Sequence, residues 1–125
     1  MSGLTLDSGA LIAIEKEDRR VATLISRALA LRAGIAVPAG VVGQVWRSGA
    51  RQARIARLLR SPAVEVEPLD DLRARAAGQL CGITGTDDVI DASVALCARR
   101  RGQTVLTSDP DDIRRLDASL RVESV

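Results

Sequence analysis

Histidine, tyrosine and phenylalanine are absent from this 125-residue chain, and tryptophan and lysine occur once each, as Trp46 and Lys16. Without histidine there is no Ser-His-Asp triad, no Cys-His pair, no histidine general base and no His-ligated zinc ion. A Walker A loop needs a Gly-Lys pair, and Lys16 is not part of one. The lack of Tyr and Phe argues against an RNA binder built on an aromatic platform. Any catalysis is left to carboxylates, hydroxyls, Arg, Cys and a metal held by oxygen ligands.

Cysteines and long apolar runs are also scarce. Cys81 and Cys97 form neither a CxxC pair nor a zinc spacing, so we interpret them as buried free thiols in a reducing compartment. The longest uncharged stretch, 33–46, has 14 residues and contains Pro38, whereas a membrane span needs about 20 apolar residues. The N-terminal sequence MSGLTLDSG has neither the basic start nor the apolar core of a signal peptide. We therefore expect a cytoplasmic protein with no membrane partner.

The net charge of the chain is small, but its basic residues are almost all arginine. The net charge is +2, and 17 of the 18 basic residues are arginine. Arginine binds phosphate through a planar, two-pronged donor, so a phosphate-bearing partner is one interpretation. A general compositional preference for arginine is the other, and the net charge does not separate the two. The content of 46% hydrophobic and 27% charged residues is typical of a globular protein, and the length predicts a single domain, 1–125.

Short apolar runs alternate with helical patterns along the chain. The runs predict strands over 4–6, 35–37, 64–67, 104–107 and 120–125. Helical spacing predicts helices over 8–16, 18–33, 39–47, 50–60, 69–81, 87–101 and 111–116. Gly34 is expected to cap the second helix and Thr86 the sixth, with a loop over 82–85. The pattern predicts an α/β fold, a three-layer sandwich in which helices flank a mostly parallel sheet of four or five strands.

Aspartates are expected to gather at one edge of this sheet. Asp7 follows the first strand directly, Asp109 follows the fourth by two residues, and Asp91 lies one turn into the helix that leads to the fourth. Asp88 shares a helix face with Asp91. Each aspartate alone is explained as a cap, a turn former or a surface residue. Together, close carboxylates raise one another's pKa, and a divalent cation would remove that cost. Oxygen ligands select Mg²⁺ or Mn²⁺ over zinc.

Four segments resemble the PIN-domain ribonucleases, and most closely the VapC-type toxins of bacterial toxin–antitoxin modules. They are LTLDSGALIA, VVGQVWR, DASVALCARRRG and TVLTSDPDDIRRL, and they occur in the family's order over nearly the whole chain. The resemblance implies that Asp7, Asp91 and Asp109 are catalytic metal ligands and that Asp112 is a further acid of the site. It also implies a PIN-like fold, a homodimer and a cognate antitoxin as partner.

The chain departs from the family pattern at one position. The family's glutamate on the helix after the second strand corresponds to Gln44, which keeps an amide oxygen but loses a negative charge. We expect Asp88, one turn before Asp91, to supply the missing carboxylate to the metal. The alternative is a catalytically weakened or inactive PIN fold that binds RNA or protein without cleaving it.

The activity implied by the resemblance is metal-dependent hydrolysis of RNA phosphodiester bonds by an activated water, with Mg²⁺ or Mn²⁺ as cofactor. Thr107 or Ser108 is expected to bind a phosphate or a metal-bound water, unless it only forms the turn. Arg47, Arg51 and Arg54 are spaced by four and three residues, which predicts one helical face. That face is interpreted as an RNA-binding stripe, as a contact for an acidic antitoxin segment, or as a solvated surface.

Two other α/β classes place aspartates at strand ends, and both are disfavoured. A receiver domain needs an Asp after the third strand and a Lys after the fifth, but here the third strand ends in Glu67 and Pro68. A haloacid-dehalogenase phosphatase needs a second Asp two positions after the first, where this chain has Gly9.

Overall fold

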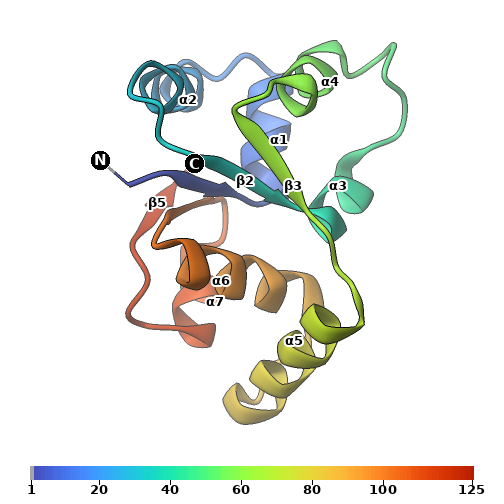
Figure 1. Cartoon of the computed structure of the whole chain (residues 1–125), viewed down its shortest axis with the longest axis vertical. Helices are drawn as coiled ribbons and strands as arrows, with labels where there is room; N and C mark the ends of the chain where they lie inside the picture. Colours follow the sequence, from blue (N-terminus) through green and yellow to red (C-terminus); the bar gives the residue numbers. More distant parts are fainter. Residues whose placement is uncertain (1) are drawn as a thin grey trace.

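Five parallel strands form the centre of the computed structural model, which describes residues 2–125 (Figure 1). The strands are β1 (Leu4–Leu6), β2 (Ile35–Pro38), β3 (Val64–Glu67), β4 (Thr104–Thr107) and β5 (Val122–Ser124). Their order is β3-β2-β1-β4-β5, so the first strand of the chain lies in the middle of the sheet. Leu4 pairs with Ile35 of β2 on one side and with Thr104 of β4 on the other. β1 and β2 are buried along their whole length, as expected for strands covered on both faces.

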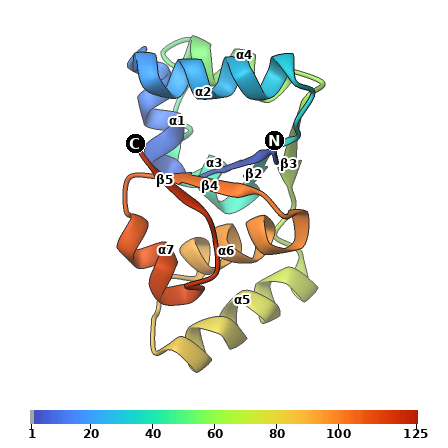
Figure 2. The same cartoon turned by 90° about the vertical axis from the view of Figure 1, so that its left-hand side faces the viewer.

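Seven helices surround the sheet. They are α1 (Ser8–Glu15), α2 (Arg19–Ala30), α3 (Ala39–Val45), α4 (Ala53–Arg60), α5 (Asp71–Thr84), α6 (Val89–Arg101) and α7 (Pro110–Leu116). α1, α2 and α4 lie on one side of the sheet, whereas α6 and α7 lie on the other with α5 outermost (Figure 2). The predicted three-layer α/β sandwich is therefore confirmed. Of the helices in residues 2–125, none has the length and hydropathy that crossing a bilayer requires.

The core has two parts because α5 does not pack on the sheet. The larger cluster joins the sheet to both helix layers and includes Leu6, Leu11 and Leu106. The smaller cluster lies among α5, α6 and α7, where the small side chains of Ala92 and Ala95 let α5 approach α6. Both cysteines are free and buried, as the sequence predicts.

Several predicted helix ends are wrong, and each has a local cause. The expected loop over 82–85 is helical up to Thr84, and the helix ends at Gly85 with a left-handed φ of 71°. α6 begins two residues later than expected, because Asp88 rather than Thr86 caps it by accepting the Asp91 N–H at 2.9 Å. α2 ends at Ala30, so Gly34 is not its cap, and Arg32 takes the positive φ of 54°.

Candidate functional site

Asp7 is the buried acid at the carboxyl end of the central strand. It is only 5% exposed, and its Oδ1 caps α1 by accepting the Ala10 N–H at 3.1 Å. Burial raises the pKa of Asp7, a hydrogen bond from the Thr107 hydroxyl lowers it, and the charge of Asp109 raises it. Asp7 is thus a helix cap, and its carboxylate also interacts with that of Asp109.

The end of β4 lies directly against the start of α1. A Cβ added at Gly9 would overlap the Ser108 side chain, so only glycine allows this approach. Thr107 Oγ1 accepts the Asp109 N–H at 2.9 Å, which fixes the turn between β4 and α7. Asp109 precedes α7 without capping it, and the Asp109 side chain is exposed. Its carboxylate is therefore available to a ligand.

The charges of four other aspartates at this edge of the sheet affect the pKa of Asp91. Burial and then the charges of Asp88, Asp112, Asp7 and Asp109 raise the pKa of Asp91 from 3.8 to about 6. These aspartates lie just after β1, at the start of α6 and at the start of α7, up to 105 positions apart in sequence. The five aspartates expected at the carboxyl edge of the sheet therefore share one electrostatic neighbourhood.

The donor chemistry of this neighbourhood suits a hard divalent cation, since carboxylate and hydroxyl oxygens are the groups available. Mutual repulsion at Asp91 is the cost that a cation would remove. Within residues 2–125, however, no three Asp, Glu, Cys or His side chains are close enough to form a ready-made metal site. The residues thus fit such an ion chemically, without a preassembled coordination shell.

An open cavity of about 390 Å³ adjoins these acids. Its walls come from the end of α5, the start of α6 and the middle of α7. They comprise Gly85, Thr86, Asp87, Asp88, Asp91, Asp112, Arg115 and Leu116. Asp91 and Asp112 therefore face a space that is large enough for part of a substrate.

Gln44 lies on α3, which begins at the carboxyl end of β2. Gly40, one turn earlier on the same face, abuts Ile90, and an added Cβ would overlap the Ile90 side chain. Ile90 directly precedes Asp91, so α3 meets α6 beside the acidic group. Gln44 is exposed, and the structure places it one helical turn beyond this contact.

The prediction that Arg47, Arg51 and Arg54 share one helical face is wrong. α3 ends at Val45 and α4 starts at Ala53, so the first two arginines lie in the connecting loop. Arg54 lies on α4 and pairs with Glu17 at 2.9 Å and with Glu15 at 3.4 Å. All three arginines are exposed. Their binding to RNA stays a prediction.

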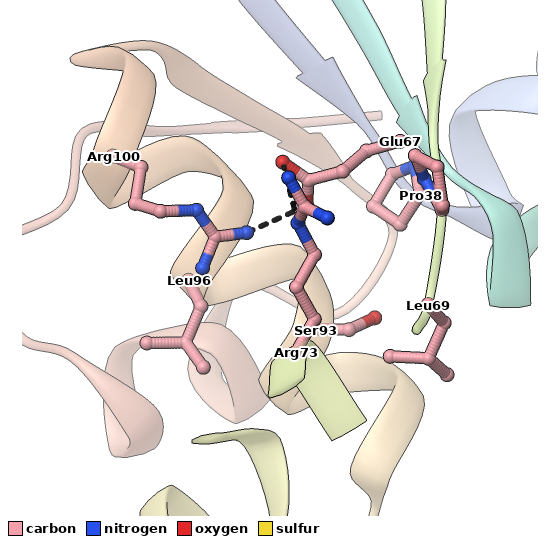
Figure 3. Close-up of a pocket in the computed structure, with 8 residues that line it drawn as sticks. Pro38, Glu67, Leu69, Arg73, Ser93, Leu96 and Arg100 are labelled. Carbon is pink, nitrogen blue, oxygen red and sulfur yellow. Dashed lines mark hydrogen bonds and ion pairs between the residues drawn. The ribbon is translucent and has the colours of Figure 1, made fainter. Parts of the chain in front are cut away.

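Sequence reasoning missed a second polar group at the same edge, at the end of β3 (Figure 3). Glu67 is 4% exposed and contacts Arg100 at 2.7 Å, Arg101 at 3.3 Å and Arg73 at 3.8 Å. The cavity beside it measures about 10 Å³, roughly the space of one water. This ion-pair group therefore ties β3 to α5 and α6 and does not hold a ligand. The sequence feature that could have indicated this group is the arginine run 99–101. Arg100 and Arg101 pair with Glu67, whereas Arg99 pairs with Asp117.

Comparison with known proteins agrees with this geometry. The family model of the PIN domain matches residues 4–119, and no curated protein matches the sequence significantly. Solved structures that share the fold include the following three. VapBC2 from Rickettsia felis bound to a DNA fragment from their promoter gives a TM-score of 0.71 at 17% identity, covering 98% of each chain.

The other two structures contain related proteins. FitAB bound to the IR36 DNA fragment gives a TM-score of 0.65 at 16% identity, covering 97% of this chain and 94% of that chain. FitAcB from Neisseria gonorrhoeae gives 0.63 at 18% identity, covering 95% of each chain. At these identities the likeness concerns the fold.

Proposed function

The chain belongs to the PIN-domain family, and from that premise we propose that it is a divalent-metal-dependent endoribonuclease that acts as the toxin of a toxin–antitoxin pair. The main support for this proposal is the raised pKa of Asp91. Burial, together with the charges of aspartates from other elements at the carboxyl edge of the sheet, raises the pKa of Asp91 to about 6. A fold has no structural need for such repulsion, whereas a cation site does.

We assign the metal to Asp7, Asp91 and Asp109, with Asp88 and Asp112 at its margin. Bound Mg²⁺ or Mn²⁺ supplies a Lewis acid that polarises the phosphodiester and lowers the pKa of a water. The Thr107 side chain lowers the pKa of the Asp7 carboxyl, which favours the charged form. Asp88 uses one oxygen to cap α6 at the Asp91 N–H, which holds Asp91 in place. No protein nucleophile is required.

We assign substrate binding to arginine and serine side chains around the carboxylates. Arg47 and Arg51, on the exposed loop after α3, would contact phosphates together with Arg54. The Ser108 hydroxyl is exposed at the end of β4, beside Asp109 Oδ2 at 3.4 Å. It is in a position to donate a hydrogen bond to a phosphate oxygen.

Cleavage of a mixed RNA pool by purified protein tests the proposal. With Mg²⁺ or Mn²⁺ the wild type should cut RNA, whereas EDTA or Asp91→Asn should abolish cutting. Asp111→Asn is the matched control, because Asp111 lies in the first turn of α7 with a side chain 95% exposed. Cutting that persists in EDTA would refute a metal-dependent enzyme.

A second candidate is a PIN fold that binds RNA or protein with little or no cleavage. Gln44 at the family's glutamate position favours it, as does the lack of a ready-made group of three acids in residues 2–125. Calorimetric titration with Mn²⁺ separates the two candidates. Specific binding that Asp91→Asn removes supports the enzyme, and no binding supports the non-catalytic fold.

A protein partner is part of the proposal. The groove between α2 and α4 has a volume of about 880 Å³ and an apolar floor that includes Ile25, Leu29 and Leu58. Arg19 and Arg57 lie at its rim. An amphipathic acidic segment of a cognate antitoxin would fit this combination. A small reading frame beside the gene, encoding a DNA-binding protein, would supply the candidate for a binding assay.

We also propose that the protein is a cytoplasmic homodimer. Leu72 and Ile83 on the outermost helix, α5, are 78% and 83% exposed. Such side chains on one helix are typical of a surface that is covered in an assembly. Sedimentation of the wild type and of Leu72→Lys/Ile83→Lys would test the homodimer, since the double variant should sediment as a monomer.

A further inference from the structure

Positive charge is concentrated in one continuous stretch of the chain. Residues 19–64 contain nine arginines and no Asp or Glu, whereas the remainder holds all 16 acidic residues and nine basic ones. The two parts carry formal charges of +9 and −7, which combine to the +2 of the whole chain. The basic stretch forms α2, β2, α3 and α4. The α2 and α4 side of the molecule is therefore suited to a polyanion.

The loop between α3 and α4, at the end of this basic stretch, is held in place by one side chain. Gln52 Oε1 accepts the N–H groups of Arg47 at 2.8 Å and Ser48 at 3.1 Å. Gln52 Nε2 donates to the Val45 carbonyl at 2.8 Å. The Trp46 N–H donates to the Val42 carbonyl at 2.8 Å, which closes the end of α3. The backbone on both sides of Trp46 is therefore fixed.

Trp46 is the only aromatic residue of the chain, and it does not serve the core. Its side chain is 38% exposed, and it belongs to neither buried cluster nor to the residues packed against them. Gly49 lies along one edge of the indole, where an added Cβ would be 3.4 Å from Cζ2. An ordered loop thus leaves part of a large flat side chain accessible to a ligand.

Two arginines flank this indole. The guanidinium of Arg47 donates to the Trp46 carbonyl at 2.7 Å, and Arg51 follows in the same loop. In residues 2–125 neither arginine forms an ion pair. Gly40, packed on Ile90 next to Asp91, lies about 9 Å from Trp46 along α3 at 1.5 Å per residue. The loop therefore extends from the edge that carries the carboxylates.

We propose that Trp46 stacks on a nucleobase of single-stranded RNA while Arg47 and Arg51 contact the adjacent phosphates. This inference rests on the proposed ribonuclease function and names the residue that would hold the strand beside the acids. Stacking on an indole tolerates every base, because each base has a flat face. A multi-residue aromatic platform is excluded by composition, but a single stacking residue is not.

The experiment uses the fluorescence of this one tryptophan. Asp91→Asn protein, which should bind RNA without cutting it, is titrated with a ten-nucleotide RNA of mixed sequence at low salt. We expect saturable quenching with the same midpoint as the anisotropy of a labelled copy of that RNA. Trp46→Leu should weaken binding by about 5- to 100-fold, whereas Trp46→Phe should recover most of it. Leu31→Ala, at an exposed apolar residue just after α2, is the matched control.

Salt dependence separates stacking from charge. Arg51→Ala should lower the slope of log affinity against log salt by about one, whereas Trp46→Leu should weaken binding and leave the slope unchanged. Binding seen by anisotropy without quenching, and undiminished in Trp46→Leu, would overturn the inference and leave the ribonuclease proposal intact. If wild-type protein neither binds nor cuts the RNA, the proposed function itself fails.

Discussion

Replacing Asp91 with asparagine should stabilise the protein at neutral pH while abolishing its activity. Asp91 is partly buried among four other carboxylates, and its pKa is raised from 3.8 to about 6. Between these two values the native state binds more protons than the unfolded state. The free energy of unfolding therefore falls as pH rises from about 4 to about 6, and the loss is complete above that range. Asparagine has no charge to lose, so the variant escapes this penalty.

The size of the effect follows from the pKa difference. The raise to about 6 corresponds to about 3 kcal/mol, and solvent screening of a partly exposed group reduces it to about 2 kcal/mol. Asparagine also gives up the favourable charge of Asp91 in the first turn of α6, which costs about 0.5 kcal/mol. The net expectation for Asp91→Asn is a gain of about 1.5 kcal/mol at pH 8, shrinking to about zero or below at pH 4.

Urea unfolding in EDTA at pH 8 and at pH 4 measures both numbers. The control is Asp111→Asn, a fully solvated acid in the first turn of α7, which should change stability by less than about 0.5 kcal/mol at either pH. Added Mn²⁺ should stabilise the wild type at pH 8 and leave Asp91→Asn unchanged. If Asp91→Asn is less stable than the wild type at pH 8 in EDTA, repulsion among the acids is not the dominant feature of this edge.

Three further substitutions test other contacts. Gly9→Ala should lower the free energy of unfolding by about 1–3 kcal/mol in thermal unfolding and reduce RNA cleavage at least 10-fold, because the new methyl group overlaps the end of β4. The control is Gly43→Ala, which has open space around it and should leave stability the same or higher. Gln44→Glu should raise Mn²⁺ affinity by about 10-fold in calorimetry, and an unchanged affinity would place this residue outside the metal site. Glu67→Gln should cost about 2–3 kcal/mol in urea unfolding because the Glu67 carboxylate is buried among arginines, whereas the exposed Glu65→Gln should cost much less.

The strands and the acidic edge could be predicted because each depends on short-range information. A strand such as 104–107 is a brief run of β-branched and apolar residues, and a parallel sheet brings the residues after each strand to one edge. Asp7 and Asp109 were located by this rule alone. The rule says nothing of coordination distances, and the roles of the aspartates as metal ligands stay predictions.

The missed features depend on tertiary contacts. Gly82 was expected to break α5, but burial of Leu80 and Cys81 against α6 keeps the helix going past an exposed glycine. The arginine spacing predicted that Arg47, Arg51 and Arg54 share one helical face, but Gln52 organises residues 46–52 as a loop. The ion pairs of Glu67 join positions more than 30 residues apart, and no local pattern reports them.

The central position of β1 has a consequence for synthesis of the protein. β1 leaves the ribosome first, yet its partner β4 begins 100 residues later, with Leu4 paired to Thr104. At the usual rates of translation, β1 waits roughly 5–20 s for β4. Asp7 and Asp109 are joined only after that pairing, so no nascent chain carries the complete acidic edge. Under the proposed function, the chain would gain its metal site only after that delay, and a partner that binds during those seconds would meet it before its first turnover.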